Sequence, residues 1–467
     1  MLVQPFTTHF SNIGEQVFLR CDPKYRHFWD NQKGVSLEQT TYRNTRLKGV
    51  LLPFIKTVIK KGELNEERPI LELNDVESRT SLILQERIVT EVGSDKLDFV
   101  DCDLVFNRLE PYLGKIIINE KSKNYIGTTE WIPLKLDQNQ MRPLFLKYLL
   151  LLSQFLQSFG LLKSGKRHAR IALVDFRNIF IPLPSHGQQA EIEKRILPIE
   201  ERMVSLYRSL AKPIDIINSV FAHEFGYSLK EYENRAKQNT YQKTFSNLDK
   251  AFLLRSTVKF QHPKYEYLDE ILGGHKSVKL KTLCGARIHR GVQPNYDSDG
   301  EVLVVKTLNL KHEYLDFSEA DHVTQEFFEA HREAEIKKND ILLSSTGEGR
   351  GKVDIYDLEE AAIADTHISI IRLTDNVNPY YVLYFMRSLL GKLQLETLEM
   401  AIKGTPEIYW YQLEQMRIID LPRKKQDTIV EEVRAELQEL QHQRAEIQKL
   451  RDQIDEIFMQ AIMNEVR

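Results

Sequence analysis

The sequence contains the same succession of segments twice, and this constrains the fold more than any other feature. Residues 10–27, FSNIGEQVFLRCDPKYRH, align without a gap to residues 245–262, FSNLDKAFLLRSTVKFQH. A second pair, DLVFNRLEPYLGKI at 103–116 and DILLSSTGEGRGKV at 340–353, lies 237 residues apart. Self-similarity at a fixed period indicates a repeated architecture. The order of the segments predicts two similar domains, each followed by a long helix.

Three shorter pairs occur in the same order along the chain. They are VIKKG and RIHRG (58–62 and 287–291), TEWIPLKL and THISIIRL (129–136 and 366–373), and IPLPSHGQQ and IDLPRKKQD (181–189 and 419–427). Their β-branched, apolar runs, bounded by Gly and Asp, predict strands. A collinear series of matches across both halves is difficult to obtain by chance. We therefore expect an α/β (α+β) tandem with a pseudo-two-fold internal repeat.

Two stretches of heptad spacing follow the two α/β segments and predict long helices. The apolar positions are Ile196, Ile199, Met203, Leu206, Leu210 and Ile217 in the first, and Val433, Leu437, Leu440, Ile447, Leu450 and Ile454 in the second. Two matching seams favour an antiparallel coiled coil. The alternative is two separate amphipathic helices, each docked on its own domain. Pro198 and Pro213 lie in the first seam, where an interior proline kinks or ends a helix.

These patterns predict four regions along the chain. They are a first domain at 1–185, a central helical region and linker at 186–240, a second domain at 241–422 and a C-terminal helix at 423–467. A length of 467 residues agrees with two or three domains.

Composition excludes few classes of partner, because the net charge is only −3. A nucleic-acid binder of this composition has to segregate its basic residues onto particular faces. Cys21, Cys102 and Cys284 lie far apart without metal-ligand spacing. That pattern favours a reducing cytoplasm over a disulfide frame or structural zinc.

No basic and apolar leader is visible at the N-terminus, so we expect no signal peptide. The most apolar run, residues 144–162, contains the polar residues Lys147, Gln154, Gln157 and Ser158. A membrane span is more uniformly apolar, which favours a buried amphipathic helix over this run.

Several segments together resemble the specificity (S) subunit of type I restriction-modification systems. They are NDILLSSTGEGRGKVDIY and CDLVFNRLEPYLGKIII within the repeats, the helix entries IFIPLPSHGQQAEIEKRI and RIIDLPRKKQDTIVEEV, and AIKGTPEIYW at 401–410. Each motif alone is loose, and their order and duplication carry the resemblance. The first half departs from the pattern, because SGKRHAR (164–170) replaces the Gly-Thr turn.

The resemblance implies a fold and a function. Each repeat would be a target-recognition domain that reads one half of a split sequence in double-stranded DNA. The two long helices would hold the domains apart and dock two copies of an adenine methyltransferase subunit. S-adenosylmethionine would bind in that partner, and ATP and Mg in any restriction subunits. The chain itself would be non-catalytic, without a cofactor, and cytoplasmic in a bacterium or archaeon.

Basic loops are the candidate DNA contacts, although a charge run is more often a solvated face. KSGKRHAR (163–170) contributes Lys163, Lys166, Arg167, His168 and Arg170 without a carboxylate. The other candidates are Lys60, Lys61, His289 and Arg290 before matched glycines, Arg108, Tyr112, Lys115, Ser345, Thr346, Arg350 and Lys352 in the second repeat pair, and Lys403 and Thr405 in the Gly-Thr turn. Such residues read base edges or grip phosphate, and spacing does not separate the two roles.

SSTGEGRGK (344–352) has the glycines and lysine of a nucleotide-binding loop, yet it fails the P-loop pattern. No glycine lies five residues before the pair Gly351-Lys352, and no Ser or Thr follows that pair. The matching NRLEPYLGK keeps only Gly114-Lys115 of these features. We therefore expect a turn between strands in both halves.

Signals for enzymatic chemistry are weak. NPYY (378–381) has the look of an adenine methyltransferase motif, but Asn378 corresponds to Arg142 in the first half, which leaves a structural proline at a helix start. EIK (335–337), with Asp316 and Asp321 upstream, has no counterpart and is most simply a solvated face. The histidines show no metal-ligand spacing.

Three classes of function stay open at this point. The first is a DNA-recognition subunit, belonging either to a restriction-modification complex or to a related phage-defence or methylation system without a restriction subunit. The second is a scaffold or toxin-like interaction protein that reuses the duplicated fold. The third is a fused methylating or cleaving enzyme, for which the sequence carries no complete motif.

Overall fold

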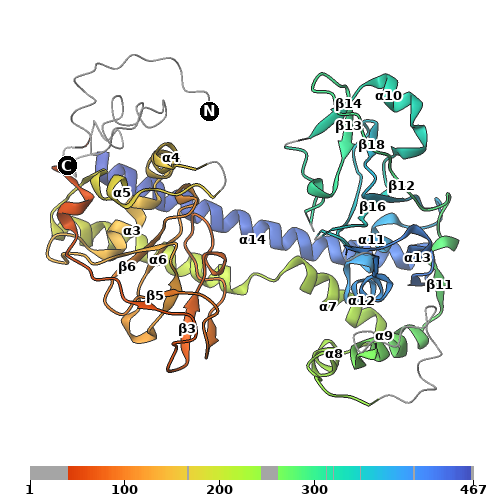
Figure 1. The fold of residues 1–467 in the computed structure, drawn as a ribbon, viewed down its shortest axis with the longest axis horizontal. Helices are drawn as coiled ribbons and strands as arrows, with labels where there is room; N and C mark the ends of the chain where they lie inside the picture. The colour runs from red at the N-terminus through yellow and green to blue at the C-terminus, as the bar shows by residue number, and fades with distance from the viewer. Residues whose placement is uncertain are drawn as a thin grey trace. The chain divides into compact units, whose positions relative to one another are not determined.

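The computed structural model describes residues 40, 42–165, 168–242, 261–311, 313–318, 320–347, 349–402 and 405–463. The first repeat pair, 10–27 and 245–262, lies outside these ranges except for its last two positions. The chain forms two compact units (Figure 1). Unit 1 comprises Met1–Leu210 and Gln443–Arg467, and unit 2 comprises Ala211–His442.

Unit 1 contains two main sheets and a closing pair of strands. The larger sheet has the order β2-β5-β8-β3-β4, with β2 at Val58–Ile59, β3 at Arg68–Leu71, β4 at Arg87–Val89, β5 at Lys96–Asp98 and β8 at Ile126–Thr128. The smaller has the order β7-β6-β9, with β6 at Leu104–Asn107, β7 at Ile116–Ile118 and β9 at Trp131–Leu134. β1 (Asn44–Arg46) pairs antiparallel with β10 (Phe180–Pro182) and so joins the two ends of the domain.

The described residues of unit 1 before Leu210 also form the helices α3 (Pro143–Leu151), α4 (Ser153–Leu162), α5 (Leu173–Asn178) and α6 (His186–Ser209). The single helix expected over 144–162 is wrong, because Leu152 has an extended backbone (φ −55°, ψ 139°) and separates α3 from α4. The burial expected for this run is confirmed by Leu149, Phe155 and Phe159, which are inaccessible to solvent. Among the described helices none alone has the length and apolarity to cross a membrane, and α3 with α4 meets that test only as a pair bent by 70°.

Unit 2 has the same succession of strands. One sheet has the order β14-β13-β18-β15, with β13 at Val302–Val305, β14 at Asp321–Val323, β15 at Glu335–Ile336 and β18 at Ala362–Ala364. The other has the order β12-β19-β16-β17, with β12 at His289–Arg290, β16 at Ile341–Ser344, β17 at Val353–Ile355 and β19 at Ile368–Ile371. β11 (Ser277–Lys279) pairs with β22 (Arg417–Ile419), and β20 (Met400–Ile402) with β21 (Thr405–Glu407).

The described helices of unit 2 follow the order of unit 1, with additions before the first strand and between β14 and β15, and the last of them continues into unit 1. They are α7 (Pro213–Phe225), α8 (Leu229–Ala236), α9 (Pro263–Gly273), α10 (Gln325–Ala330), α11 (Pro379–Arg387), α12 (Leu389–Leu398), α13 (Trp410–Leu413) and α14 (Arg423–Met463). The residue between α11 and α12, Ser388, is extended like Leu152 between α3 and α4. The break in this helix pair therefore occurs in both units.

The strand registers of the two units coincide. β6 pairs Leu104 with Leu134 of β9, and β16 pairs Ile341 with Ile371 of β19, each residue 237 positions later. β3 runs parallel to β8, as β13 does to β18. One difference is that β2 joins β5 in unit 1, whereas β12 joins β19 in unit 2. The described halves therefore have the same topology around the same central strands.

A buried glutamine makes the same hydrogen bonds at the start of each long helix. In unit 1 the side chain of Gln189 accepts from the backbone N–H of Arg142 at 2.9 Å and donates to the carbonyls of Gln140 and Pro184. In unit 2 Gln426 accepts from Asn378 N–H at 2.8 Å and donates to the carbonyl of Leu421. Each glutamine thus ties the exit from the last strand to the first turn of α3 or α11.

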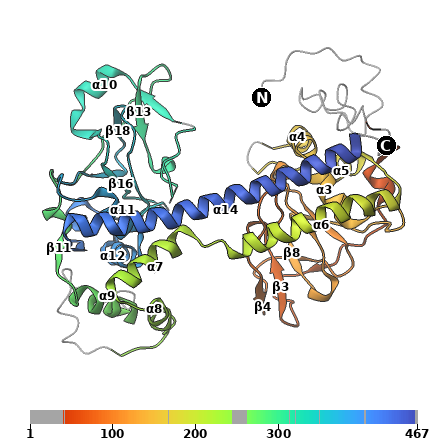
Figure 2. The ribbon, with the colours of Figure 1, turned by 180° about the vertical axis from the view of Figure 1, so that it is seen from behind.

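The predicted central helical region is divided between the units. α6 ends at Ser209, and α7 begins with Pro213 in its first turn, so Pro213 starts a helix while Pro198 lies inside one. α6 lies beside the second part of α14, in unit 1 (Figure 2), where Arg202 pairs with Glu446. α7 contacts the first part of α14, in unit 2, through Glu224 and Lys425.

The predicted seam residues face the cores of their own units. Ile196, Met203, Ile447, Leu450 and Ile454 are buried in the core of unit 1, with Ile199, Leu206 and Leu210 packed against it. Ile217 and Val433 are buried in the core of unit 2, with Leu437 against it, and Leu440 is also buried. The heptad spacing therefore serves helix-to-domain packing as well as helix-to-helix contact.

Substitution of Gln189 by leucine tests the role of the buried glutamine. The change leaves the Arg142 N–H and two carbonyls, of which that of Pro184 is buried, without this partner, and we expect unit 1 to lose about 2–3 kcal/mol of unfolding free energy. Denaturant unfolding measures the loss. Gln453→Leu, on an exposed position of α14, is the matched control and should change stability little. Equal effects of the two substitutions would contradict the assigned role.

Candidate nucleic-acid interface

The turn between β6 and β7 in unit 1 and the turn between β16 and β17 in unit 2 have left-handed residues at equivalent positions. Between β6 and β7, Glu110 and Gly114 have left-handed φ values of 50° and 60°. Between β16 and β17, Gly347 and Gly351 have φ values of 73° and 78°. The glycines of SSTGEGRGK thus serve a turn between antiparallel strands, because glycine adopts this region freely. The expectation of a turn instead of a P-loop is confirmed.

Surrounding residues fix the turn of unit 1 in place. The Asn107 side chain donates to the carbonyls of Leu109 and Glu110 at 2.8 and 3.0 Å. The Ser81 hydroxyl donates to the carbonyl of Gly114 at 3.0 Å. The backbone N–H of Glu110 donates to the carbonyl of Ala169 at 2.8 Å, which joins this turn to the basic loop 163–170.

The basic loop 163–170 is closed by backbone pairing of Ser164 with Arg170. Lys163 places its Nζ 4.3 Å from the centre of the Tyr112 ring, so two predicted contacts are adjacent. The Arg170 guanidinium makes a bidentate pair with Glu130, at 2.6 to 3.0 Å. His168 is exposed with a left-handed φ of 55°. Lys166 and Arg167 lie outside the described residues.

The remaining predicted DNA contacts of unit 1 already form hydrogen bonds with other groups of the chain, and they differ in exposure. Lys60 is exposed and bonds Asp95 at 2.8 Å, while the N–H of Lys61 donates to the same carboxylate. Lys115 donates its Nζ to the carbonyl of Leu73 at 2.8 Å, and burial lowers the pKa of its ammonium. Lys115 is therefore the weakest of these candidates.

Two further cations near Arg108, namely Lys56 and Arg177, were missed by the sequence analysis. Burial, together with the positive charges of Arg108 and Arg177, holds the pKa of Lys56 below its ordinary value. Within the described part of the chain, none of the three has a carboxylate at ion-pair distance. Lys56 lies just outside a matched segment and Arg177 on α5, so only the fold brings them to Arg108. Ile55, which precedes Lys56 in the sequence, is 88% exposed.

In unit 2 the equivalent region is built from β12, the β16–β17 turn and β21. Arg290 forms an ion pair with Glu407 and donates to the carbonyl of Ile408 at 2.9 Å. The Thr346 hydroxyl and the Nδ1 of His367 lie 2.7 Å apart. The neighbouring His289 has its Nδ1 2.9 Å from the carbonyl of Arg287.

Other predicted contacts of unit 2 are less accessible. Ser345 is fully buried, and its hydroxyl lies 2.6 Å from that of Ser369, which is a structural role. Arg350 pairs with Glu399 at 3.0 Å. Lys352 is half-buried. Thr405 lies in β21 with its side chain undescribed, and Lys403 falls outside the described residues.

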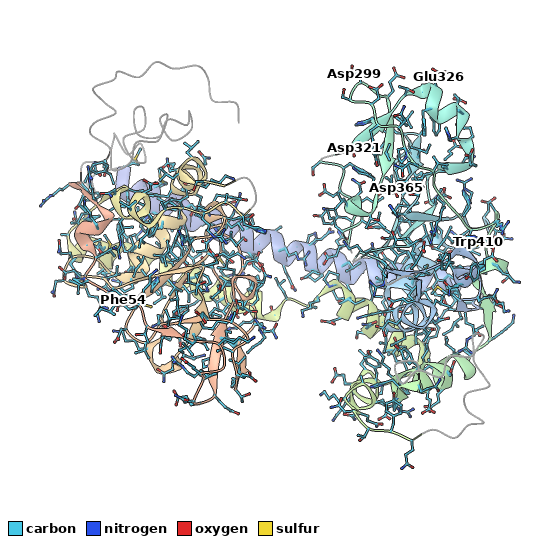
Figure 3. All side chains as sticks on the ribbon, in the orientation of Figure 1. Phe54, Asp299, Asp321, Glu326, Asp365 and Trp410 are labelled. Atoms are coloured by element: carbon cyan, nitrogen blue, oxygen red, sulfur yellow. The ribbon has the colours of Figure 1, made fainter. Side chains whose placement is uncertain are left out.

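An aromatic and basic group on α13 was also missed. The Arg287 guanidinium lies 3.8 Å from the centre of the Trp410 ring, and Tyr409 stacks on Tyr411 at 5.6 Å. Figure 3 shows Trp410 at the edge of unit 2. The sequence feature that could have indicated this group is IYWY at 408–411, where three aromatic residues follow the Gly-Thr turn.

Equivalent positions of the two units carry different polar groups. The N–H of Arg108 bonds the carbonyl of Glu130, and the N–H of Ser345 bonds that of His367, both at 2.8 Å. Leu109 pairs with Arg170, as Thr346 pairs with Glu407. Glu130 and Arg170 are thus replaced in unit 2 by His367 and Glu407. The backbone is retained, while donors and acceptors are exchanged.

The residues considered for enzymatic chemistry have structural roles. Asn378 caps α11 by accepting from the N–H of Tyr380 at 2.9 Å, and Pro379 lies in the first turn, which confirms the interpretation of NPYY. Glu335, Asp316 and Asp321 pair separately with arginine or lysine side chains of their own neighbourhoods. Within the described ranges, no three His, Cys, Asp or Glu side chains are arranged to hold a metal ion.

Solved structures similar to the chain come from type I restriction-modification systems. The HsdS subunit from Thermoanaerobacter tengcongensis is 16% identical, covers 91% of this chain and 97% of its own, and has a TM-score of 0.33. The S subunit from M. genitalium is 12% identical, with coverages of 91% and 97% and a TM-score of 0.40. A chain from a type I R-M system studied for complex assembly and conformational transition is 16% identical, with coverages of 90% and 97% and a TM-score of 0.44. No family model matches the sequence, and no curated protein matches it.

The Glu130–Arg170 pair predicts a pH-dependent contribution to stability. Its hydrogen bond with Arg170 lowers the pKa of the Glu130 carboxyl below the usual 4.5. The pair therefore stabilises the fold above that value and loses its effect as the pH falls through the lowered pKa. Glu130→Gln should cost about 1 kcal/mol or less at neutral pH, and nothing in strong acid. Unfolding of both proteins across this pH range measures it, and a difference that is constant with pH would contradict the assignment.

Proposed function

We propose that the chain is the specificity subunit of a type I restriction-modification complex, in which each unit reads one half of a bipartite DNA sequence. The observation that carries this proposal is the retained backbone around exchanged polar side chains. A duplicated reader of two different half-sites needs one scaffold and two sets of donors and acceptors. Glu130 and Arg170 in unit 1, and His367 and Glu407 at the equivalent positions of unit 2, are two such sets of donors and acceptors.

The turns and basic loops supply the contacts with DNA in this proposal. Arg108 is exposed and, with Lys56 and Arg177, offers positive charge that lacks a carboxylate at ion-pair distance in the described residues. Such cations suit phosphates. In unit 2, Arg287 on Trp410 offers a cation and a flat aromatic surface together. Lys163, His168, Thr346 and Arg290 complete the two proposed faces.

The paired helices supply the docking surface for partners in this proposal. α6 and α7 contact the two parts of α14 and leave charged residues of all three helices exposed. Two methyltransferase subunits would dock on the two similar units, so the catalytic steps, with S-adenosylmethionine, belong to the partner. The chain then contributes recognition and geometry, and restriction subunits would add ATP-dependent cleavage where the system includes them.

A scaffold that does not read DNA is the second candidate, and one observation favours it. Several predicted DNA contacts are already engaged by carboxylates of the chain, namely Lys60, Arg170, Arg290 and Arg350. A surface whose cations are neutralised in this way binds phosphate weakly. This candidate predicts no salt-dependent DNA binding, even with partners present.

Methylation sequencing of a host that carries the chain and its methyltransferase partner tests the proposed function. We expect a split motif with a fixed gap of about half to one turn of DNA, because in this proposal the two long helices hold the readers apart. Exchanging residues 245–422 for another such domain should change one half of the motif only. A continuous motif, or no methylation that depends on this chain, would refute the proposal. A change in both halves would refute the assignment of one reader to each unit.

The salt dependence of DNA binding tests which cations contact phosphate. Lys56→Ala should reduce the slope of log K against log salt by about 0.9, the value for one released phosphate contact. Lys60→Ala is the matched control, since Asp95 already engages that ammonium, and its slope should change less. Fluorescence titration of the assembled complex measures both. Equal changes would show that the Lys56 cluster has no special role.

A further inference from the structure

Glu110 occupies a backbone conformation that a glutamate tolerates poorly. Its φ and ψ are 50° and 58°, in the left-handed region, where a side chain collides with the backbone. Pro111 follows it, and a proline further restricts the residue before it to extended conformations. Unit 2 has Gly347 at the equivalent position, with a φ of 73°. The turn thus requires the conformation, and only unit 1 supports it with a strained side chain.

Among the described residues, no contact of the Glu110 side chain offsets this strain in the folded chain. The Glu110 backbone is held by the Asn107 side chain and by the carbonyl of Ala169. Its carboxylate, by contrast, has no hydrogen bond or ion pair to any residue that the structure describes. The ammonium of Lys115 interacts with the Glu110 carboxylate only electrostatically, without a direct bond, because the Nζ of Lys115 donates to the carbonyl of Leu73. Strain without a structural purpose is typical of functional positions.

The surroundings of Glu110 indicate what the carboxylate contacts. It lies two residues from Arg108 and two from Tyr112, on whose ring Lys163 rests. These cations attract a polyanion, while a lone carboxylate repels its phosphates. A carboxylate on such a face is favourable only toward a hydrogen-bond donor, and the donors in the major groove are the amino groups of cytosine and adenine.

We propose that Glu110 is a specificity-determining residue of unit 1 and accepts a hydrogen bond from a base amino group, most simply the N4 of cytosine. Gly347 provides no such acceptor, so the two half-sites differ at this position. The proposal rests on the proposed function and adds the chemistry of one contact. The rigid turn holds the carboxylate without an ordering cost on binding.

Glu110→Gly separates specificity from folding, because it removes the strain together with the carboxylate. The variant should melt about 1–4 °C higher than the wild type. In the assembled complex, methylation sequencing should show one position of a single half-site relaxed, with discrimination reduced about 5- to 10-fold. Glu110→Gln, which adds a donor, should shift the preference at the same position toward adenine.

Asn124→Gly is the matched control. Asn124 also has a left-handed φ, 51°, but lies at the end of a 3-10 helix away from the turn, so its replacement should leave the motif unchanged. An unchanged motif in both Glu110 variants would overturn the inference. Relaxation in the Asn124 variant as well would overturn it too, because strain relief alone would then be the cause. Absence of a split motif in the wild type would instead overturn the proposed function.

Discussion

The hydrogen bonds of one buried glutamine fix each domain to the start of its long helix. Gln189 and Gln426 satisfy backbone groups of two separate segments, which no apolar side chain can do. A closing strand pair, β1 with β10 or β11 with β22, directly precedes this helix start in each unit. With this helix start fixed, the central sheet has one register, and its turns are held in defined positions. Under the proposed function, two readers of different half-sites depend on such a scaffold.

The sequence permitted prediction of the features that depend on local chemistry. The offset of 237 between residues 103 and 340 predicted matching strands, and the registers of β6 and β16 show that offset residue by residue. The missing P-loop residues after Gly351 predicted a turn, and Pro143 and Pro379 predicted helix starts. In each case a short pattern determines the backbone, so long-range packing changes little.

Features that depend on contacts between distant segments were not predictable. Pro198 and Pro213 both indicated a kink or an end in the first seam, but the heptad spacing continues across both, so the sequence did not show that only Pro213 starts a new helix. Ser345 was predicted to contact DNA, but its hydroxyl lies buried against that of Ser369. Strand pairing decides which side of the turn faces inward, and the sequence alone does not show that pairing. Arg170 was read as a free cation, because Glu130 is 40 residues away in sequence.

The two turns show how the same backbone can be built with or without a side chain at its left-handed position. A left-handed position costs a non-glycine residue about 1–2 kcal/mol, whereas glycine meets it freely but presents no side chain. Unit 2 uses Gly347 and draws its polar groups from neighbouring elements, with His367 and Glu407 on either side of the turn. Unit 1 retains Glu110, and left-handed Arg79, Ser81 and His168 lie in the segments that contact the same turn. Several strained residues therefore lie at or beside one turn of unit 1, and under the proposed function a side chain at a fixed position there matters more than a relaxed backbone.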